Sequence, residues 1–338
     1  MGTAETLNGE QTPIPARRLG KGQGAAIALK VAITAGCFWY LSRQIDFTAL
    51  RLALASLNFG WAALAVALLA TQIPLVAFRW TEILSVLRLN DARWTFSCTL
   101  AVTAIGQFVS QILPTAVGDG IRVFFLSRYS GRWHDATVSV VIDRGLGVGL
   151  LVAFGFVILL LPSQIDMPGA YRDIVIAMLG ALLLAGIIAL EIGSRLAPRL
   201  AGWKYGHFLA DLFVVTRRVL LSGHGAKVIC AGSLIHVLTI IAVWSLGQAL
   251  DLPFAPSDAA ILFVLMTGVV LIPISIGGWG TREFAVVSLL RHYGVAPEHA
   301  LIFSMSFGLA CVAASLPGAI VWFVFTPPRA DSRLGSRS

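Results

Sequence analysis

Charged residues are scarce in this sequence. Only 12% of its 338 residues are Asp, Glu, Lys or Arg, whereas 57% are hydrophobic, and the mean hydropathy is +0.83. A soluble domain carries about 25% charged residues, so this chain has too little charge to cover a surface that faces water. The scarcity of charge excludes a soluble globular protein. The 33 glycines follow no fixed period, which excludes a fibrous protein as well.

Cysteine is also rare, and the common catalytic and metal-binding signatures are missing. The 4 cysteines form no CxxC pair, and no histidine stands near them at metal-ligand spacing. We therefore expect small buried side chains rather than disulfides or zinc ligands. No GxSxG, HExxH, P-loop or dinucleotide-binding pattern occurs. We expect no bound metal, no cofactor and no step driven by a nucleotide.

The hydrophobic residues are gathered in long runs. Each run is long enough, at about 1.5 Å per residue, to reach across a hydrocarbon core about 30 Å thick. The eight apolar segments are residues 25–42, 60–80, 96–113, 136–161, 173–192, 226–250, 258–276 and 300–325. A barrel strand would show only about 10 residues of alternating pattern. We therefore predict an all-α, polytopic membrane helix bundle over 25–325, with disordered tails at 1–24 and 326–338.

The basic residues argue against eight full crossings. If every segment crossed, the loops on the two sides would carry similar numbers of Lys and Arg, contrary to the positive-inside bias. Segments 96–113 and 258–276 each run into a proline followed by glycines, in ILPTAVGDG and IPISIGGWG, and such residues interrupt a helix and permit a turn. If both segments turn back, with second limbs at 121–131 and 281–292, most Lys and Arg fall on the side of the N-terminus. We predict six full spans and two re-entrant hairpins, with both termini in the cytoplasm.

The span, hairpin and span recur in two units, 60–161 and 226–325. Both hairpins carry the spacing Pro-x3-Gly at the turn, once at Pro114 and once at Pro273. The number of crossings between the units gives them opposite orientations. We therefore predict an inverted repeat whose hairpins enter from opposite faces of the membrane, an arrangement typical of transporters.

The long internal connection, 193–225, is strongly basic. Lys and Arg are frequent from Arg195 to Lys227, and apolar residues recur between them at helical spacing. Two interpretations remain open: an amphipathic interfacial helix that binds an anionic leaflet, or an ordinary positive-inside loop. The net charge of +8 fits either one. Because no basic stripe is interleaved with aromatic residues, we expect no nucleic acid partner.

Six ionisable residues lie inside or beside the apolar segments, where a charge costs about 2.5–3.5 kcal/mol. They are Asp119, Arg122, Asp143, Arg144, Arg282 and Glu283. Because neighbours on a helix point about 100° apart, we expect Asp143 to pair with Arg122, and Arg144 with Asp119 or a lipid phosphate. These charges either fasten the first hairpin to the bundle or leave one arginine to bind the phosphate of a headgroup.

A polar stripe and two glycine clusters complete the candidate site. Thr103, Gln107 and Gln111 recur every four residues along 96–113, and they line either a helix contact or a hydrophilic groove. The second limbs would present free N–H groups, which attract anions, beside glycines that allow a close approach. These glycines are Gly118, Gly120, Gly277, Gly278 and Gly280.

Three ordered stretches resemble a known family. LPTAVGDGIRVFFLSR (113–128), VVIDRGLG (140–147) and IPISIGGWGTREFAVVSLL (272–290) are similar to motifs of the lysylphosphatidylglycerol synthase transmembrane region, also called the flippase-like domain family. The resemblance extends over about 30–325. It implies a multi-pass membrane protein that moves or handles a lipid with a polar or phosphate headgroup, and it points to the same six ionisable residues. Its best-known member carries an aminoacyl-transferase domain, whereas only a short tail follows residue 325 here, so we do not expect the synthase activity.

The sequence therefore favours a lipid flippase of the cell (inner) membrane, with a polar passage between the two hairpins. Two alternatives remain. One is an accessory membrane subunit of a lipid-linked glycan or lipid-modifying pathway. The other is an intramembrane enzyme acting on a lipid phosphate, with Asp119, Asp143 or Glu283 as a base or metal ligand.

Overall fold

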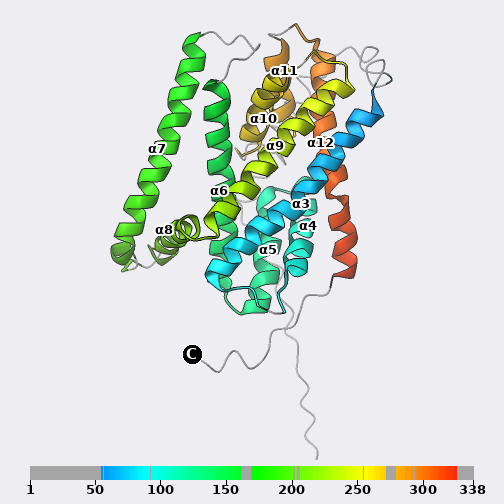
Figure 1. Cartoon of the computed structure of the whole chain (residues 1–338). Helices are drawn as coiled ribbons and strands as arrows, with labels where there is room; N and C mark the ends of the chain where they lie inside the picture. Colours follow the sequence, from blue (N-terminus) through cyan, green and yellow to red (C-terminus); the bar gives the residue numbers. More distant parts are fainter. Residues whose placement is uncertain are drawn as a thin grey trace, which may run out of the picture.

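The structure is a computed structural model, and it describes residues 55, 57–91, 93–160, 169–200, 202–203, 206–253, 255–271, 279–291 and 294–325. These residues form ten α-helices, and no strand occurs among them. The helices, labelled as in Figure 1, are α3 (Phe59–Leu87), α4 (Phe96–Ile112), α5 (Thr115–Ser130), α6 (Trp133–Leu160), α7 (Gly169–Leu200), α8 (Gly206–Leu221), α9 (Gly225–Ala249), α10 (Pro256–Leu271), α11 (Thr281–Arg291) and α12 (Pro297–Val324). The predicted segment 25–42 and both predicted tails lie outside the described residues.

Five helices are long and apolar enough to cross a membrane. These are α3, α6, α7, α9 and α12, with lengths of 25 to 32 residues. Each coincides with one of the predicted spans. The chain is thus a polytopic helical membrane protein, as expected.

Four other helices are shorter within the described residues. α4 has 17 residues, α5 and α10 have 16 each, and α11 has 11, whereas a span needs about 20 residues. Figure 1 shows α4 and α5 side by side in the lower half of the bundle, and α10 and α11 side by side in the upper half. The two pairs thus occupy opposite ends of the molecule.

The chain returns with α5 to the end of the bundle where α4 begins. The Tyr129 hydroxyl near the end of α5 donates a hydrogen bond to the Asp91 carboxylate, just before α4, and this bond lowers the pKa of Asp91 below its usual value. Arg132 donates to the carbonyl oxygen of Arg88, at the end of α3, over 3.5 Å. The pair α4 and α5 is therefore a helical hairpin.

The second limb of this hairpin begins earlier than predicted. We expected it at 121, after a glycine turn, but α5 starts at Thr115, directly after Pro114. Proline fits a helix start because its fixed φ is helical and its missing N–H would have no partner there. Gly118 consequently lies inside the helix, where a Cβ would collide with the Gly106 carbonyl oxygen and the Ser110 hydroxyl of α4. Gly118 therefore allows α5 to pack closely against α4.

Two more boundaries differ from prediction. α3 continues beyond residue 80 to Leu87 because Trp80, Ile83 and Leu84 extend its buried stripe, so Arg79 lies inside the helix and not in a loop. α7 continues to Leu200, and the amphipathic helix α8 follows it. The predicted connection 193–225 is thus mostly helical.

Helix α12 contacts both short pairs. It packs against α11 in the upper half of the bundle and against α4 in the lower half (Figure 1), whereas no contact joins the pair α4 and α5 to the pair α10 and α11 within the described ranges. Two hydrophobic clusters fill the interior. One gathers buried residues of α9 to α12 together with residues of α3 and α6, and the other joins α3 to α6.

Candidate functional site

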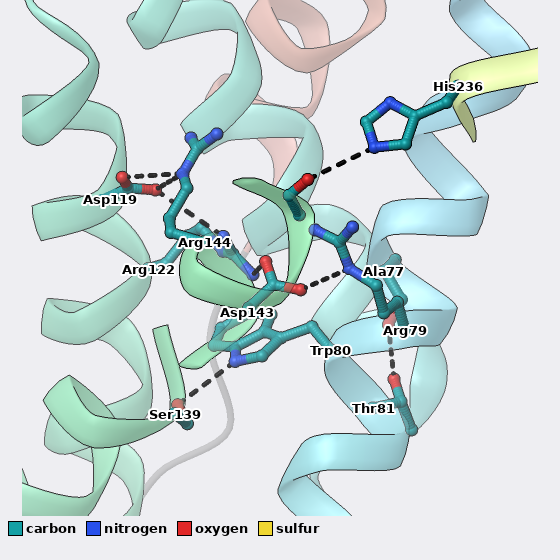
Figure 2. Close-up of polar contacts among 11 residues, drawn as sticks. Ala77, Arg79, Trp80, Thr81, Asp119, Arg122, Ser139, Asp143, Arg144 and His236 are labelled. Carbon is teal, nitrogen blue, oxygen red and sulfur yellow. Dashed lines mark hydrogen bonds and ion pairs between the residues drawn. The ribbon is translucent and has the colours of Figure 1, made fainter. Parts of the chain in front are cut away.

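Asp143 lies at the centre of a buried network of charges. Its side chain on α6 is 1% exposed, and its two oxygens accept from two different helices. Oδ1 accepts from Arg79 Nε of α3 at 2.7 Å, and Oδ2 accepts from Arg122 Nη2 of α5 at 2.8 Å (Figure 2). A single carboxylate thus ties three helices together. The predicted pair Asp143–Arg122 is present, and Arg79 is a partner that sequence reasoning missed.

Two glycines lie beside Arg79 where α3, α6 and α9 meet. A Cβ at Gly147 of α6 would lie 3.4 Å from Arg79 Nη1, and one at Gly232 of α9 would lie 3.5 Å from the same atom. Nearby, His236 Nε2 is 3.3 Å from the Gly147 carbonyl oxygen, and its ring lies 5.4 Å from that of Phe263. His236 is therefore a packing residue that hydrogen-bonds a neighbouring helix.

Arg122 is enclosed on all sides. Its guanidinium lies 4.2 Å above the ring of Trp80, a cation–π contact, and the Trp80 indole donates to Ser139 at 3.2 Å. The Arg122 Nε is buried without a hydrogen-bond partner among the described residues. The residue is thus held in place by packing as much as by Asp143.

Asp119 and Arg144 form the accessible part of the network. Arg144 Nε lies 2.9 and 2.8 Å from the two Asp119 oxygens, which is the predicted pair. Asp119 also lies 3.6 Å from Arg122 Nη1, so it links the exposed part to the buried part. The side chain of Arg144 is 42% exposed and that of Asp119 is 20% exposed.

The network carries an excess positive charge. Among the described residues, Arg79, Arg122 and Arg144 face two carboxylates, those of Asp119 and Asp143. Gly120 and Gly145, the chain neighbours of Asp119 and Arg144, are exposed, and a Cβ at either position would meet no atom within 4 Å. Of the three guanidiniums, that of Arg144 is the most accessible.

The polar stripe on α4 is buried at one end only. Thr103 is fully buried, and its hydroxyl has no hydrogen-bond partner in the described chain. Gln107 and Gln111 are half-buried, and we find no hydrogen bond from either amide to a described residue. Their amides can therefore hydrogen-bond an incoming group.

The charges at the start of α11 form a separate pair among the described residues. Arg282 and Glu283 are 5% and 0% exposed, and Arg282 Nη2 donates to Glu283 Oε1 at 2.6 Å. Glu283 also accepts from the Ser304 hydroxyl at 3.3 Å and from the Gly280 N–H at 2.6 Å. We predicted a free N–H at the start of α11, but Glu283 caps the Gly280 N–H. Because the helix is capped by its own carboxylate, this end does not present that donor to an anion.

Aromatic residues enclose Arg282 further. Its guanidinium lies 4.9 Å from the Trp279 ring and 5.8 Å from the Phe307 ring. Gly308 provides the space, because a Cβ there would collide with Arg282 Nη2. The predicted binding glycines Gly277 and Gly278 lie outside the described residues. Within the described ranges no ion pair joins Arg282 or Glu283 to the network around Asp143, and no group of three or more metal-binding side chains occurs.

Comparisons with known proteins agree with the membrane architecture. The family described as "Lysylphosphatidylglycerol synthase TM region" matches residues 27–318, which include both charge clusters. A "UPF0104 membrane protein" of Methanothermobacter thermautotrophicus is 23% identical over 222 residues, which cover 57% of this chain. The match spans 65% of that relative's length, slightly less than two thirds. No solved structure matches.

Proposed function

Because this chain belongs to the family of the lysylphosphatidylglycerol synthase TM region, we propose that it is a lipid flippase of the cell (inner) membrane. It moves a lipid with a polar or phosphate headgroup across the bilayer while the acyl chains remain in hydrocarbon. The observation that carries this proposal is the excess positive charge on α3, α5 and α6, where three arginines face two aspartates. Such a charge inside an apolar bundle attracts an anionic group.

Arg144 is the residue that binds the headgroup in this proposal. It is the most exposed arginine of the network, with 42% of its side chain accessible, and its planar guanidinium suits two phosphate oxygens. When a phosphate replaces Asp119 on Arg144, Asp119 keeps Arg122 as a partner 3.6 Å away. The Gln107 and Gln111 amides, which are half-buried on α4, provide further hydrogen bonds in place of water.

The two helix pairs provide access from both leaflets in this proposal. Both pairs are re-entrant hairpins of an inverted repeat, and both chain termini lie in the cytoplasm. Supporting this, the helices of each pair are shorter than a span, and the pairs occupy opposite halves of the bundle (Figure 1). Inverted repeats allow a fixed site to open alternately to each side.

The pairing of the carboxylates favours transport over catalysis. An intramembrane phosphate enzyme would need Asp119, Asp143 or Glu283 as a base or metal ligand. Each of these three accepts from an arginine instead. Asp143 and Glu283 are also almost fully buried, which keeps a substrate away from their oxygens.

The test is lipid flipping by the purified protein in liposomes. Phosphatidylglycerol with a fluorescent acyl chain is reconstituted on both leaflets, and a membrane-impermeant reductant reports the outer pool over time. We expect Arg144→Gln to slow flipping by about ten- to a hundredfold, because a charged hydrogen bond contributes about 1.5–3 kcal/mol. The control is Arg132→Gln, which removes a half-exposed arginine that pairs with Asp135, and it should flip at the wild-type rate.

Two outcomes would contradict the proposal. One is flipping by folded Arg144→Gln at the wild-type rate. The other is wild-type protein that does not accelerate flipping above empty liposomes for either phosphatidylglycerol or a lipid with a phosphomonoester headgroup. Thermal unfolding of each variant in detergent shows whether it is folded before the rates are compared.

A further inference from the structure

A basic pocket lies between α7 and α8, away from the arginine network. It opens widely to the surface and is formed by three side chains from each helix. Its lining residues are Glu191, Ser194, Arg195, Val214, Arg217 and Arg218. None of these residues belongs to the proposed transport site, so the pocket needs its own explanation.

The pocket carries more positive than negative charge. Glu191 Oε1 accepts from Arg195 Nη2 at 2.6 Å, and Glu191 Oε2 accepts from Arg217 Nε at 3.1 Å. Arg218 is exposed and makes no ion pair with any described residue. The pocket therefore has three arginines and one carboxylate among its lining residues, which leaves about two uncompensated positive charges.

The pocket lies at one end of a lipid-facing helix. Large apolar side chains of α7, including Ile187, Ile188 and Ile192, are exposed on the approach to Glu191, and Trp203 is exposed just beyond the end of α7. Such an order, from apolar stretch to arginine and tryptophan, is typical of the boundary between hydrocarbon and headgroups. Figure 1 shows α8 lying across the lower end of α7, as an interfacial helix does.

We propose that this pocket binds the phosphate of an anionic phospholipid that resides beside α7 and α8. The phosphate oxygens take the place of Glu191 on Arg195 and Arg217, and Arg218 provides the third cation. The acyl chains of the same lipid lie along the exposed apolar side chains of α7. Basic pockets between membrane helices and interfacial arginines bind anionic headgroups for this reason. The proposal does not depend on flipping, because it involves other helices.

The experiment is a lipid titration of the purified full-length chain, followed by native mass spectrometry. The probe is phosphatidylglycerol, with phosphatidylcholine of the same chain length as the uncharged reference. We expect the double variant Arg217→Gln and Arg218→Gln to bind phosphatidylglycerol about thirtyfold more weakly, since each interfacial arginine contributes about 1 kcal/mol. Glu191→Gln should bind it about fivefold more tightly, because the competing carboxylate is gone.

Two further variants separate this site from the transport site. Arg132→Gln, which lies outside both proposed sites, should keep the wild-type affinity for phosphatidylglycerol. Adding the double variant to Arg144→Gln should weaken binding by the same factor of about thirty, relative to Arg144→Gln alone, because the two sites are independent. Unchanged affinity in the double variant and in Glu191→Gln would overturn the proposal. So would equal affinity for phosphatidylcholine, or displacement of the lipid by millimolar inorganic phosphate alone, which would indicate a site for free phosphate. Because Glu191→Gln is expected to tighten binding, a loss of folding in the double variant cannot imitate the full result.

Discussion

Asp143 shows how a membrane protein can keep several charges in an apolar interior. Its two oxygens neutralise arginines from α3 and α5 at 2.7 and 2.8 Å, and all three side chains are almost fully buried. If the carboxylate were removed, no water could take its place beside these buried guanidinium groups. The residue is therefore a structural element of the network, whereas Arg144 remains accessible.

Removal of Asp143 should destabilise the protein strongly. We expect Asp143→Ala to lower the free energy of unfolding by about 3–5 kcal/mol, because it leaves Arg79 and Arg122 buried without a counter-charge. The measurement is thermal or denaturant unfolding of the detergent-solubilised protein. Asp135→Ala is the matched control. It removes the partner of the half-exposed Arg132 and should change stability by less than about 1 kcal/mol. Equal effects in the two variants would contradict this assignment.

The ion pairs could be predicted only where few oppositely charged side chains were within reach of each other. Adjacent residues on a helix face different directions, and this led correctly to Asp143 with Arg122 and to Arg144 with Asp119. Arg79 was missed because we took the charge as the end of the span. The buried positions Trp80, Ile83 and Leu84 continue the helical stripe and would have revealed a longer α3.

The second hairpin shows the limit of the same rule. Arg282 and Glu283 are adjacent, yet they pair at 2.6 Å. They do so because Glu283 lies in the first turn of α11, where its carboxylate also caps the Gly280 N–H. Gly280 has a φ of 84°, which permits this sharp approach. Predicting the pair would have required the position of the helix start, which the sequence leaves open over several residues.

At the scale of the helices, the contact of α4 with α5 depends on small residues. Gly118 touches the backbone of Gly106 with no side chain between them, while Gly120, two residues later, faces open space. Both glycines belong to the same GDG sequence, and we took both for a turn that approaches a ligand. Only the packing of α5 against α4 shows that Gly118 is buried in the helix contact and that Gly120 is exposed.

These two glycines allow a matched test of the hairpin. We expect Gly118→Ala to destabilise the protein by about 1–3 kcal/mol, because the added methyl group must push α5 away from α4. Gly120→Ala should be neutral or slightly stabilising, because alanine favours a helix and meets no neighbour there. Unfolding of both variants in detergent is the measurement, and a larger loss for Gly120→Ala would contradict the register of α4 against α5.

For the whole molecule, hydropathy predicted the positions of the five long helices that the structure describes, but not their tilt or neighbours. The contact of α12 with both short pairs was not predicted. Contacts between helices far apart in the chain depend on how well the shapes of their side chains fit together. A single sequence does not show this fit.

The membrane topology can be tested with single cysteines. In a variant whose natural cysteines are replaced by alanine, Ser97→Cys marks the start of α4, Arg132→Cys marks the end of the hairpin, and Ser257→Cys marks the start of α10. We expect an impermeant maleimide to label the first two from one side of the membrane and the third from the other side. Labelling of Ser97→Cys and Arg132→Cys from opposite sides would show that the first hairpin crosses the bilayer, contrary to our proposal.

The position of α12 has a mechanical consequence. Its Gly318 leaves room for the Ala104 carbonyl of α4, and its Gly308 leaves room for the guanidinium of Arg282 on α11. The two glycines lie at different heights on α12, about 15 Å apart along its axis. A shift of α12 along this axis would therefore disturb its fit to α4 and to α11 together. We therefore expect a movement of α4 to be transmitted through α12 to α11, so that the two ends of the bundle change position together.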